Sequence, residues 1–196
     1  MARPKEFDQD KALQSAVRVF SQRGFAATST DELMRAMDIS RQSMYDTFGD
    51  KRALYLKALD RYVTESVEAI SVELSKPGPA IVAIRNALVK FSEREDLSSS
   101  DGCMGLNAIS EFGQRDAEVS RITWKAARKQ RLTLIRILDK AVQGGEIGTG
   151  TDVSSMADFF ESTIAGIRMA AKAGKSRTAL RNIAIFAGRA YLRLSQ

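Results

Sequence analysis

The chain has 196 residues, 44% of them hydrophobic and 28% charged, which is typical of a globular protein with one large domain or two small ones. The absence of histidine and the presence of a single cysteine exclude the commonest general base, the commonest transition-metal ligand and an internal disulfide bond. The formal net charge is +6, and its excess is C-terminal, because residues 1–62 hold 11 basic and 9 acidic residues whereas residues 172–196 hold 6 basic and no acidic ones.

The first predicted helix covers residues 8–23. Leu13, Val17 and Phe20 recur at helical spacing and form one apolar face of this segment. Gly24 follows directly, and glycine is a common C-terminal stop because it adopts left-handed dihedrals without strain. We therefore expect an amphipathic helix near the N-terminus that ends at this glycine.

Residues 28–51 (TSTDELMRAMDISRQSMYDTFGDK) contain two short helical patterns separated by a tight turn. Ser29 is a good N-cap, and Glu32 three residues later completes the sequence pattern of a capping box. Asp38 ends the first pattern and can turn the chain, because aspartate tolerates left-handed dihedrals. Ser40 then caps the second helix. Two short helices joined in this way predict a helix-turn-helix unit.

The second helix of this unit combines an apolar face with a hydrogen-bonding face. Its apolar positions are Met44, Tyr45 and Phe48. Its other side chains can bond to base edges or phosphates of DNA, and they are Arg41, Gln42, Ser43 and Thr47.

The remainder of the chain also has helical periodicity. The motif Pro77-Gly78-Pro79 is its clearest break. We predict helices near residues 51–74, 81–91, 103–112, 116–143, 154–173 and 177–194, with loops at 98–102 and 144–150. No apolar–polar alternation is long enough for a strand, so the predicted fold class is all-α with about nine helices.

Two features argue against an enzyme. The loop at residues 144–150 (GGEIGTG) is rich in glycine, but it lacks the Lys-Ser/Thr pair of a phosphate-binding loop and follows a helix rather than a strand. The chain also has no histidine and no cluster of acidic residues. We interpret the glycine-rich segment as a connection between helices.

The N-terminal motifs resemble the DNA-binding head of the TetR/AcrR family of bacterial transcriptional regulators. The resemblance covers roughly residues 7–57. It rests on residues 20–25 (FSQRGF), 28–30 (TST), 40–48 (SRQSMYDTF) and 49–51 (GDK), which follow one another in the order and spacing of the family pattern. Two positions depart from it, because the family usually has glycine where this chain has Asp38, and often has glycine where this chain has Gln42. The operator sequence therefore cannot be taken from relatives.

The resemblance implies two domains with different functions. Residues 1–52 are expected to form a three-helix, helix-turn-helix DNA-binding domain, and residues 53–196 a larger helical domain for ligand binding and dimerisation. In proteins of this family the residues matching Tyr45 and Lys51 contact DNA phosphates, whereas Arg41 and Gln42 open the recognition helix, where base edges are usually reached. The alternatives are that Tyr45 fills the core and that Lys51 is solvated. The expected DNA-binding residues are Thr28, Thr30, Arg41, Gln42, Ser43, Tyr45, Thr47 and Lys51.

The last two predicted helices are candidates for a dimer interface. The final helix is apolar on more than one side, which is typical of a helix buried inside a large core or between subunits. Periodicity leaves both possibilities open, and the resemblance favours pairing through these two helices. The expected interface residues are Phe160, Ile164, Leu180, Ile183, Ala187 and Tyr191.

A ligand pocket is expected in the C-terminal part of the chain. Cys103 lies in the segment DGCMGLNAISEF, and one branch of the family has a Gly-Cys pair at this point, beside the ligand cavity. A thiol there can sense oxidants if its pKa is depressed, but a lone cysteine is more often a small buried hydrophobe. Methionine and aromatic residues at helical spacing are likewise more often ordinary core. The expected pocket residues are Cys103, Met104, Phe112, Trp124 and Phe159.

The sequence thus predicts a ligand-responsive transcriptional repressor that acts as a homodimer on a palindromic double-stranded DNA operator. A small-molecule inducer is expected as a second partner, without a cofactor. No apolar run approaches the roughly 18 residues of a membrane span, and the N-terminus has no signal-peptide pattern, so a cytoplasmic location is expected. The alternatives are an activator of the same fold and a helical protein–protein adaptor without DNA binding.

Overall fold

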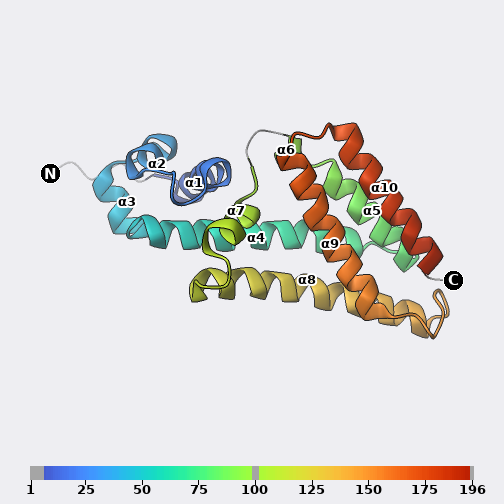
Figure 1. Ribbon diagram of the computed structural model, residues 1–196. Helices are drawn as coiled ribbons and strands as arrows, with labels where there is room; N and C mark the ends of the chain where they lie inside the picture. Colours follow the sequence, from blue (N-terminus) through green and yellow to red (C-terminus); the bar gives the residue numbers. More distant parts are fainter. Residues whose placement is uncertain (1–6, 99–101, 195–196) are drawn as a thin grey trace. The chain divides into compact units, whose positions relative to one another are not determined.

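The computed structural model describes residues 7–98 and 102–194, and all the regular secondary structure among them is helical (Figure 1). The helices are α1 (Gln9–Arg23), α2 (Thr30–Met37), α3 (Arg41–Phe48), α4 (Lys51–Leu74), α5 (Ala80–Ser92), α6 (Glu95–Ser98), α7 (Met104–Phe112), α8 (Ala117–Gln143), α9 (Val153–Lys172) and α10 (Arg177–Leu194). The predicted all-α class is confirmed. The one helix that the periodicity did not indicate is α6, which is a single turn and too short for a periodic signal. The predicted loop at 98–102 lies partly outside the described residues.

The chain packs into two compact units. Unit 1 comprises Met1–Val63 and Asp101–Thr123, and unit 2 comprises Thr64–Ser100 and Trp124–Gln196. Helices α4 and α8 each contribute residues to both units. This division reflects packing, and the functional boundary expected at residue 52 stays a prediction. No helix in the described part of the chain is long and apolar enough to cross a membrane.

An aromatic cluster lies in the core of unit 1. The ring of Tyr55 from α4 lies 5.0 Å from Phe20, 5.1 Å from Phe25 and 5.5 Å from Phe112, measured between centroids. Aromatic pairs at these separations add to the stabilisation that area burial provides. Burial also raises the pKa of the Tyr55 hydroxyl. The cluster therefore joins α1, the loop after it, α4 and α7.

Helix α7 holds the loop that leads from α1 into the helix-turn-helix unit. The Glu111 carboxylate accepts hydrogen bonds from the backbone N–H groups of Phe25, at 2.9 Å, and Ala26, at 2.8 Å. Gly24 makes room for this carboxylate, because a Cβ atom at this position would lie 2.0 Å from Glu111 Oε1. Its φ of 77° is also in the region that favours glycine. The positive φ favours glycine here, and a larger residue would in addition displace the Glu111 carboxylate from the loop.

The carbonyl groups at the C-terminal end of α1 are also bonded by α7. Asn107 is buried, and its Nδ2 donates to the carbonyl oxygen of Ser21 at 2.8 Å and to that of Phe20 at 3.4 Å. Gly102 approaches the same place so closely that a Cβ atom there would lie 2.2 Å from the Ser21 oxygen. The Phe20 carbonyl already accepts from the Gly24 N–H at 2.8 Å, so Asn107 chiefly serves the Ser21 carbonyl, since the last carbonyls of a helix lack partners within it.

An ion-pair network connects the start of α4 with the start of α8 inside unit 1. The Arg52 guanidinium lies 2.9 Å from Asp116 and 2.9 Å from Glu118. The hydrogen bond from Arg52, together with the one from the N–H of Val119, lowers the pKa of Asp116. The hydrogen bonds to Asp116 and Glu118 raise the pKa of Arg52. Because the folded-state pKa of Asp116 is lowered, its contribution to stability is complete above the ordinary value of 3.8 and is lost as the pH falls through the folded-state value.

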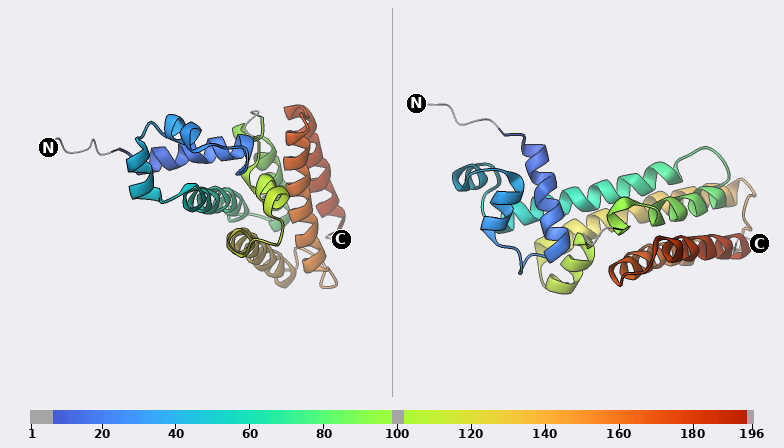
Figure 2. Two further views of the ribbon diagram at one scale, coloured as in Figure 1. Left: turned by 60° about the vertical axis from the view of Figure 1, so that its left-hand side comes forward. Right: turned by 90° about the horizontal axis from the view of Figure 1, so that it is seen from above.

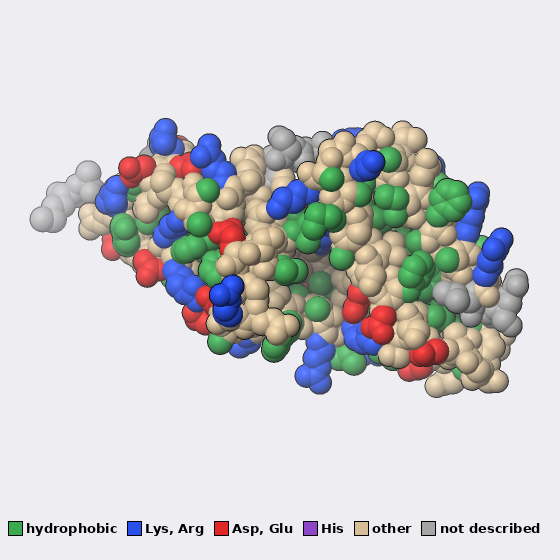
Figure 3. All heavy atoms as spheres, viewed as in Figure 1, with side chains coloured by type: hydrophobic (Ala, Val, Ile, Leu, Met, Phe, Trp, Pro, Cys, Tyr) green, Lys and Arg blue, Asp and Glu red, His purple; other side chains and the backbone are tan. Residues whose placement is uncertain are grey.

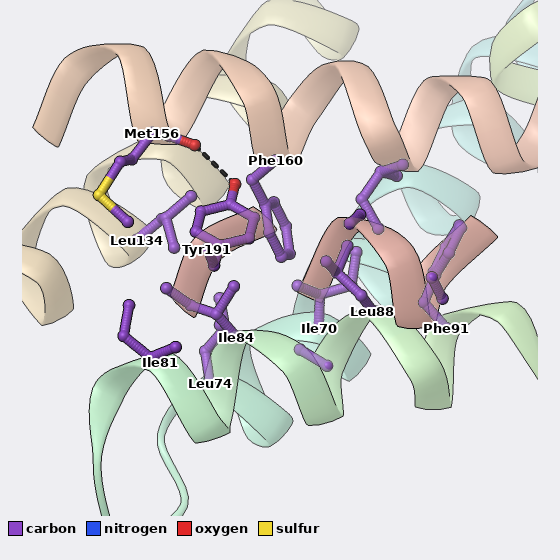
Figure 4. Close-up of a cluster of buried hydrophobic side chains, with 14 of the residues drawn as sticks. Ile70, Leu74, Ile81, Ile84, Leu88, Phe91, Leu134, Met156, Phe160 and Tyr191 are labelled. Carbon is purple, nitrogen blue, oxygen red and sulfur yellow. Dashed lines mark hydrogen bonds between the residues drawn. The ribbon is translucent and has the colours of Figure 1, made fainter. Parts of the chain in front are cut away.

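Unit 2 is a helical core in which α10 packs between α5 and α9 (Figures 1 and 4). Tyr191 is fully buried, and its hydroxyl donates to the Met156 carbonyl at 2.7 Å, which Figure 4 shows as a dashed line. This geometry corrects the expected dimer interface, because most of its residues lie inside the monomer. The buried residues of that set are Phe160, Ile164, Leu180, Ala187 and Tyr191. The intramolecular alternative is therefore correct for these five, and only Ile183, which is 39% exposed, remains accessible.

We expect Glu111→Gln to lower the free energy of unfolding by about 1–2 kcal/mol, because a neutral amide replaces a charged acceptor of two backbone N–H groups. The measurement is urea denaturation followed by circular dichroism. Asp60→Asn is the matched control, since Asp60 is exposed, and it should stay within about 0.5 kcal/mol of the parent chain. Equal stability of the two variants would show that the carboxylate does not hold the loop.

Candidate nucleic-acid interface

The first helix of the helix-turn-helix unit begins at the predicted cap. Ser29 Oγ accepts a hydrogen bond from the Glu32 N–H at 3.2 Å, which satisfies one of the unpaired donors at the start of α2. The Glu32 carboxylate pairs with Arg23 Nε of α1 at 2.8 Å. Glu32 therefore also ties α2 to the end of α1, a role that the capping-box pattern does not indicate.

The turn between α2 and α3 depends on one residue in a left-handed conformation. Asp38 has φ 54° and ψ 47°, and it is the only non-glycine residue with positive φ among the described residues. Its N–H bonds back to the carbonyls of α2, and the Ile39 N–H bonds to the Met34 carbonyl at 3.2 Å. The Ile39 side chain packs against the core of unit 1. The prediction that Asp38 turns the chain is confirmed.

Helix α3 is attached to the core by one face only. Met44 and Phe48 are buried in the core of unit 1, and Ser40 Oγ caps the helix by accepting from the Ser43 N–H at 3.1 Å. The opposite face carries the exposed side chains Arg41, Gln42, Tyr45 and Asp46. A short helix held by one face presents the other face as a rigid surface, which is how a recognition helix meets the major groove.

The exposed face of α3 has one arginine, Arg41, and this arginine is paired with a carboxylate of α2. Arg41 Nη2 lies 2.6 Å from Asp31 Oδ1, and both side chains are largely exposed. Exposed ion pairs of this kind are worth about 0–1 kcal/mol, so a phosphate or a guanine can replace the carboxylate at little cost. Figure 3 shows acidic and basic side chains interspersed over the visible face of unit 1. Asp31 was not identified from the sequence as the partner of Arg41, although it is an acidic residue in the first turn of α2.

Tyr45 lies in the middle of α3, and Lys51 is the first residue of α4. The Tyr45 side chain is 45% exposed, so its hydroxyl is accessible and the core-filling alternative is wrong. Lys51 is half-buried, and its Nζ lies 4.3 Å from the centroid of the Phe25 ring. This cation–π contact restrains the lysine at the start of α4, where the helix dipole disfavours a cation and favours an anion.

The threonine and serine candidates differ in accessibility. Thr28 is only 2% exposed, and its hydroxyl donates to the Gly24 carbonyl at 2.6 Å. The expectation of a direct DNA contact from the Thr28 side chain is therefore corrected, since this hydroxyl is occupied in closing the loop before α2. Thr30, Ser43 and Thr47 are partly exposed.

The five expected pocket residues do not come together in one unit. Cys103, Met104 and Phe112 belong to unit 1, where all three pack into its interior, whereas Trp124 and Phe159 belong to unit 2 and are 62% and 37% exposed. The Cys103 sulfur caps α7, because it accepts hydrogen bonds from the Leu106 N–H at 3.5 Å and the Tyr62 hydroxyl at 3.3 Å. The expected pocket stays a prediction, and Cys103 is a buried residue at the N-terminus of α7, as a small hydrophobe would be.

Two family models match this chain. The model of the bacterial regulatory proteins of the tetR family matches residues 12–58, which contain the helix-turn-helix unit. The model of the tetracyclin repressor-like C-terminal domain matches residues 77–185, more than half of the chain. The two matches together agree with the order of parts that the N-terminal motifs indicated.

Individual relatives extend the similarity over nearly the whole chain. The uncharacterised HTH-type transcriptional regulator YezE of Bacillus subtilis is 30% identical over 174 residues, which cover 88% of this chain and 90% of YezE. The HTH-type transcriptional repressor ComR of Escherichia coli is 29% identical over 191 residues, which cover 93% of this chain and 88% of ComR. A solved structure of the regulator CifR, a cysteine variant in complex with 26-base-pair operator DNA, is 26% identical with a TM-score of 0.76 and covers 96% of this chain and 99% of CifR. These relatives are regulators and not enzymes.

Proposed function

Because the chain belongs to the tetR family of bacterial regulatory proteins, we propose that it is a ligand-responsive repressor that binds a palindromic operator as a homodimer. The observation that carries this proposal is the geometry of α3, whose Met44 and Phe48 are buried while Arg41, Gln42 and Tyr45 face outward. A relative named as a repressor and a structural neighbour solved with operator DNA support it. The direct test is a gel-shift assay with the DNA upstream of the gene for this chain.

We propose distinct roles for the outward-facing side chains. Arg41 and Gln42 stand at the N-terminal end of the recognition helix and read base edges, since arginine suits guanine and glutamine suits adenine. Tyr45 and Lys51 contact phosphates, while the hydroxyls of Thr30, Ser43 and Thr47 add weaker contacts. Thr28 acts indirectly, through the backbone of the loop that it closes. Residues 1–52 are then the DNA-binding domain and 53–196 the ligand-binding and dimerisation domain.

We propose that the dimer interface is the outer face of α9 and α10 rather than their core face. The two helices pack side by side in unit 2, and hydrophobic side chains are visible over them in the space-filling view (Figures 2 and 3). The exposed apolar residues of this face are Phe159, Met169, Ile183 and Phe186, of which Phe186 is 67% exposed. Exposed apolar residues gathered on neighbouring helices mark a surface that a partner covers, and a two-fold dimer would present two heads to two half-sites.

The ligand response follows from thermodynamic linkage. A small molecule that binds one conformation of the dimer better than the other changes operator affinity by the same factor by which DNA changes ligand affinity. No cofactor is needed for this mechanism. Operator binding also implies that the protein works in the bacterial cytoplasm, where the chromosome lies.

Lys51→Ala should weaken binding to all DNA sequences and lower the salt dependence, log K against log salt, by roughly one unit per subunit, because one phosphate contact is lost. Fluorescence anisotropy at several salt concentrations measures this slope. Arg136→Ala, which removes an exposed cation of α8, is the control and should leave the slope unchanged. An unaltered slope for Lys51→Ala would remove Lys51 from the list of DNA contacts.

Arg41→Ala and Gln42→Ala should each cost about 1–3 kcal/mol on the operator and much less on random DNA, because a bidentate base contact is specific. Asp31→Asn should instead strengthen binding to both, since it releases Arg41 and removes a negative charge near the phosphates. Binding to a library of operator variants is the measurement. Equal losses on operator and random DNA would reassign Arg41 and Gln42 to phosphate contacts.

Phe186→Glu and Ala187→Glu change adjacent residues, but the first should affect dimerisation and the second should affect folding. Phe186→Glu places a charge on the outer face, so we expect a folded monomer in sedimentation experiments, because burying an unpaired charge costs several kcal/mol. Ala187→Glu places the charge in the core of unit 2, so we expect loss of the cooperative thermal transition. A native monomer, or a Phe186→Glu variant that is still dimeric, would contradict the proposed interface.

A further inference from the structure

A groove of about 650 Å³ lies between α5 and α10 on unit 2. Its volume is within the usual range of small-molecule sites, roughly 300–1,000 Å³. It is lined by residues of the end of α4 and the segment after it, of α5 with the residue after it, and of α10. None of its lining residues was part of the expected ligand pocket, dimer interface or DNA surface.

The groove carries more positive charge than its own carboxylates balance. Glu73 pairs with Lys76 at 2.6 Å, and Glu93 pairs with Arg181 at 3.0 Å, so both acidic side chains of the lining are already neutralised. Three further cations line the groove and have no carboxylate partner in the part of the chain that the structure describes, and these are Arg85, Lys90 and Arg189. The groove thus has a net excess of three positive charges.

Gly188 brings α10 close to α5 at this groove and positions one of these cations. A Cβ atom on Gly188 would lie 2.6 Å from Arg85 Cγ and 3.2 Å from Arg85 Cβ. The aliphatic part of Arg85 therefore lies directly against the backbone of α10. Because the clash would involve atoms near the backbone and not the flexible end of the side chain, any residue larger than glycine would force Arg85 into a different conformation.

The apolar part of the groove lining comes from Val89, Ile185 and Leu192. On α10, Ile185 occupies a different face from the core residue Ala184 and from the exposed Phe186 of the proposed dimer surface, because successive residues of a helix are rotated by about 100°. The groove borders the outer face, because the guanidinium carbon of Arg189 lies 5.6 Å from the centroid of the Phe186 ring.

We propose that this groove binds a small organic phosphate, a monoester whose apolar group contacts Val89, Ile185 and Leu192 while its phosphate lies among Arg85, Lys90 and Arg189. A phosphate monoester carries about −1.5 to −2 charges at neutral pH and three strong acceptor oxygens, which suits a site with several unpaired cations. Arginine binds phosphate through parallel N–H···O bonds, so two arginines and a lysine supply direction as well as charge. The inference concerns small-molecule binding and does not depend on operator recognition.

One of the proposed phosphate ligands comes from the basic C-terminal segment of the chain. The basic excess lies in residues 172–196, far along the sequence from the helix-turn-helix unit, so DNA binding by α3 does not explain it. Arg181 and Arg189 of that segment both line the groove. Arg181 is paired with Glu93, so a binding site for a dianion gives a function to Arg189 of this segment.

The experiment is isothermal titration calorimetry of the full chain with 1-naphthyl phosphate, with inorganic phosphate and 1-naphthol as comparison ligands. We expect 1-naphthyl phosphate to bind more tightly than either comparison ligand, and its affinity to fall as salt is raised from roughly 0.05 to 0.3 M. The variant Arg85→Gln/Lys90→Gln should bind it at least about tenfold more weakly, because charge-assisted contacts are lost. Gly188→Ala should also weaken binding, without any change of charge, by displacing Arg85.

The matched control is Arg136→Gln, which removes one exposed cation of α8 and should leave the affinity unchanged. Thermal melts verify folding, and the single variant Lys90→Gln replaces the double variant if that chain does not fold. Undiminished binding by the Arg85 and Lys90 variants, or 1-naphthol binding as tightly as its phosphate, would overturn the proposal. So would the absence of binding to the parent chain. Operator binding by the same variants separates failure of this site from failure of the proposed DNA-binding function.

Discussion

Backbone groups at the C-terminal end of α1 and in the loop after it are bonded by side chains of α7, and the arrangement of unit 1 follows from these bonds. Helix α7 supplies both kinds of partner, because Glu111 accepts from the N–H groups of Phe25 and Ala26 and Asn107 donates to the carbonyls of Ser21 and Phe20. The loop between α1 and α2 is thereby held by residues more than eighty positions away in the chain. Helix α2, the first helix of the helix-turn-helix unit, therefore starts from a segment whose path α7 determines.

Local chemistry was sufficient to predict the helix-turn-helix unit from the sequence. Ser29 and Ser40 cap their helices as their types and positions indicate, and Asp38 adopts the left-handed conformation that the turn needs. These features depend on bonds between residues a few positions apart, so the pattern of residue types contains them. The Glu111 carboxylate could not be foreseen in this way, since nothing near it in the sequence indicates that it meets the backbone at Phe25.

Periodicity identified apolar faces but not what they pack against. The last helix is apolar on more than one side, and the sequence left core and subunit contact open for the stripe containing Leu180 and Tyr191. Both side chains are buried in unit 2, whereas Phe186 remains exposed. The same limit applies to the expected pocket, since Trp124 has the residue type of a pocket wall but lies mostly in solvent. Burial depends on the tertiary arrangement, which residue type alone does not determine.

The separation of faces on α10 has a consequence for how copies of such a gene diverge. The core residue Tyr191, the groove residue Ile185 and the outer residue Phe186 lie on different sides of one helix. With the proposed interface, substitutions at Phe186 and Ile183 after gene duplication would change which chains pair, while the packing of unit 2 would stay intact. Two descendants of one gene would thus stop forming heterodimers after changes at a few positions, and each variant along the way would still fold.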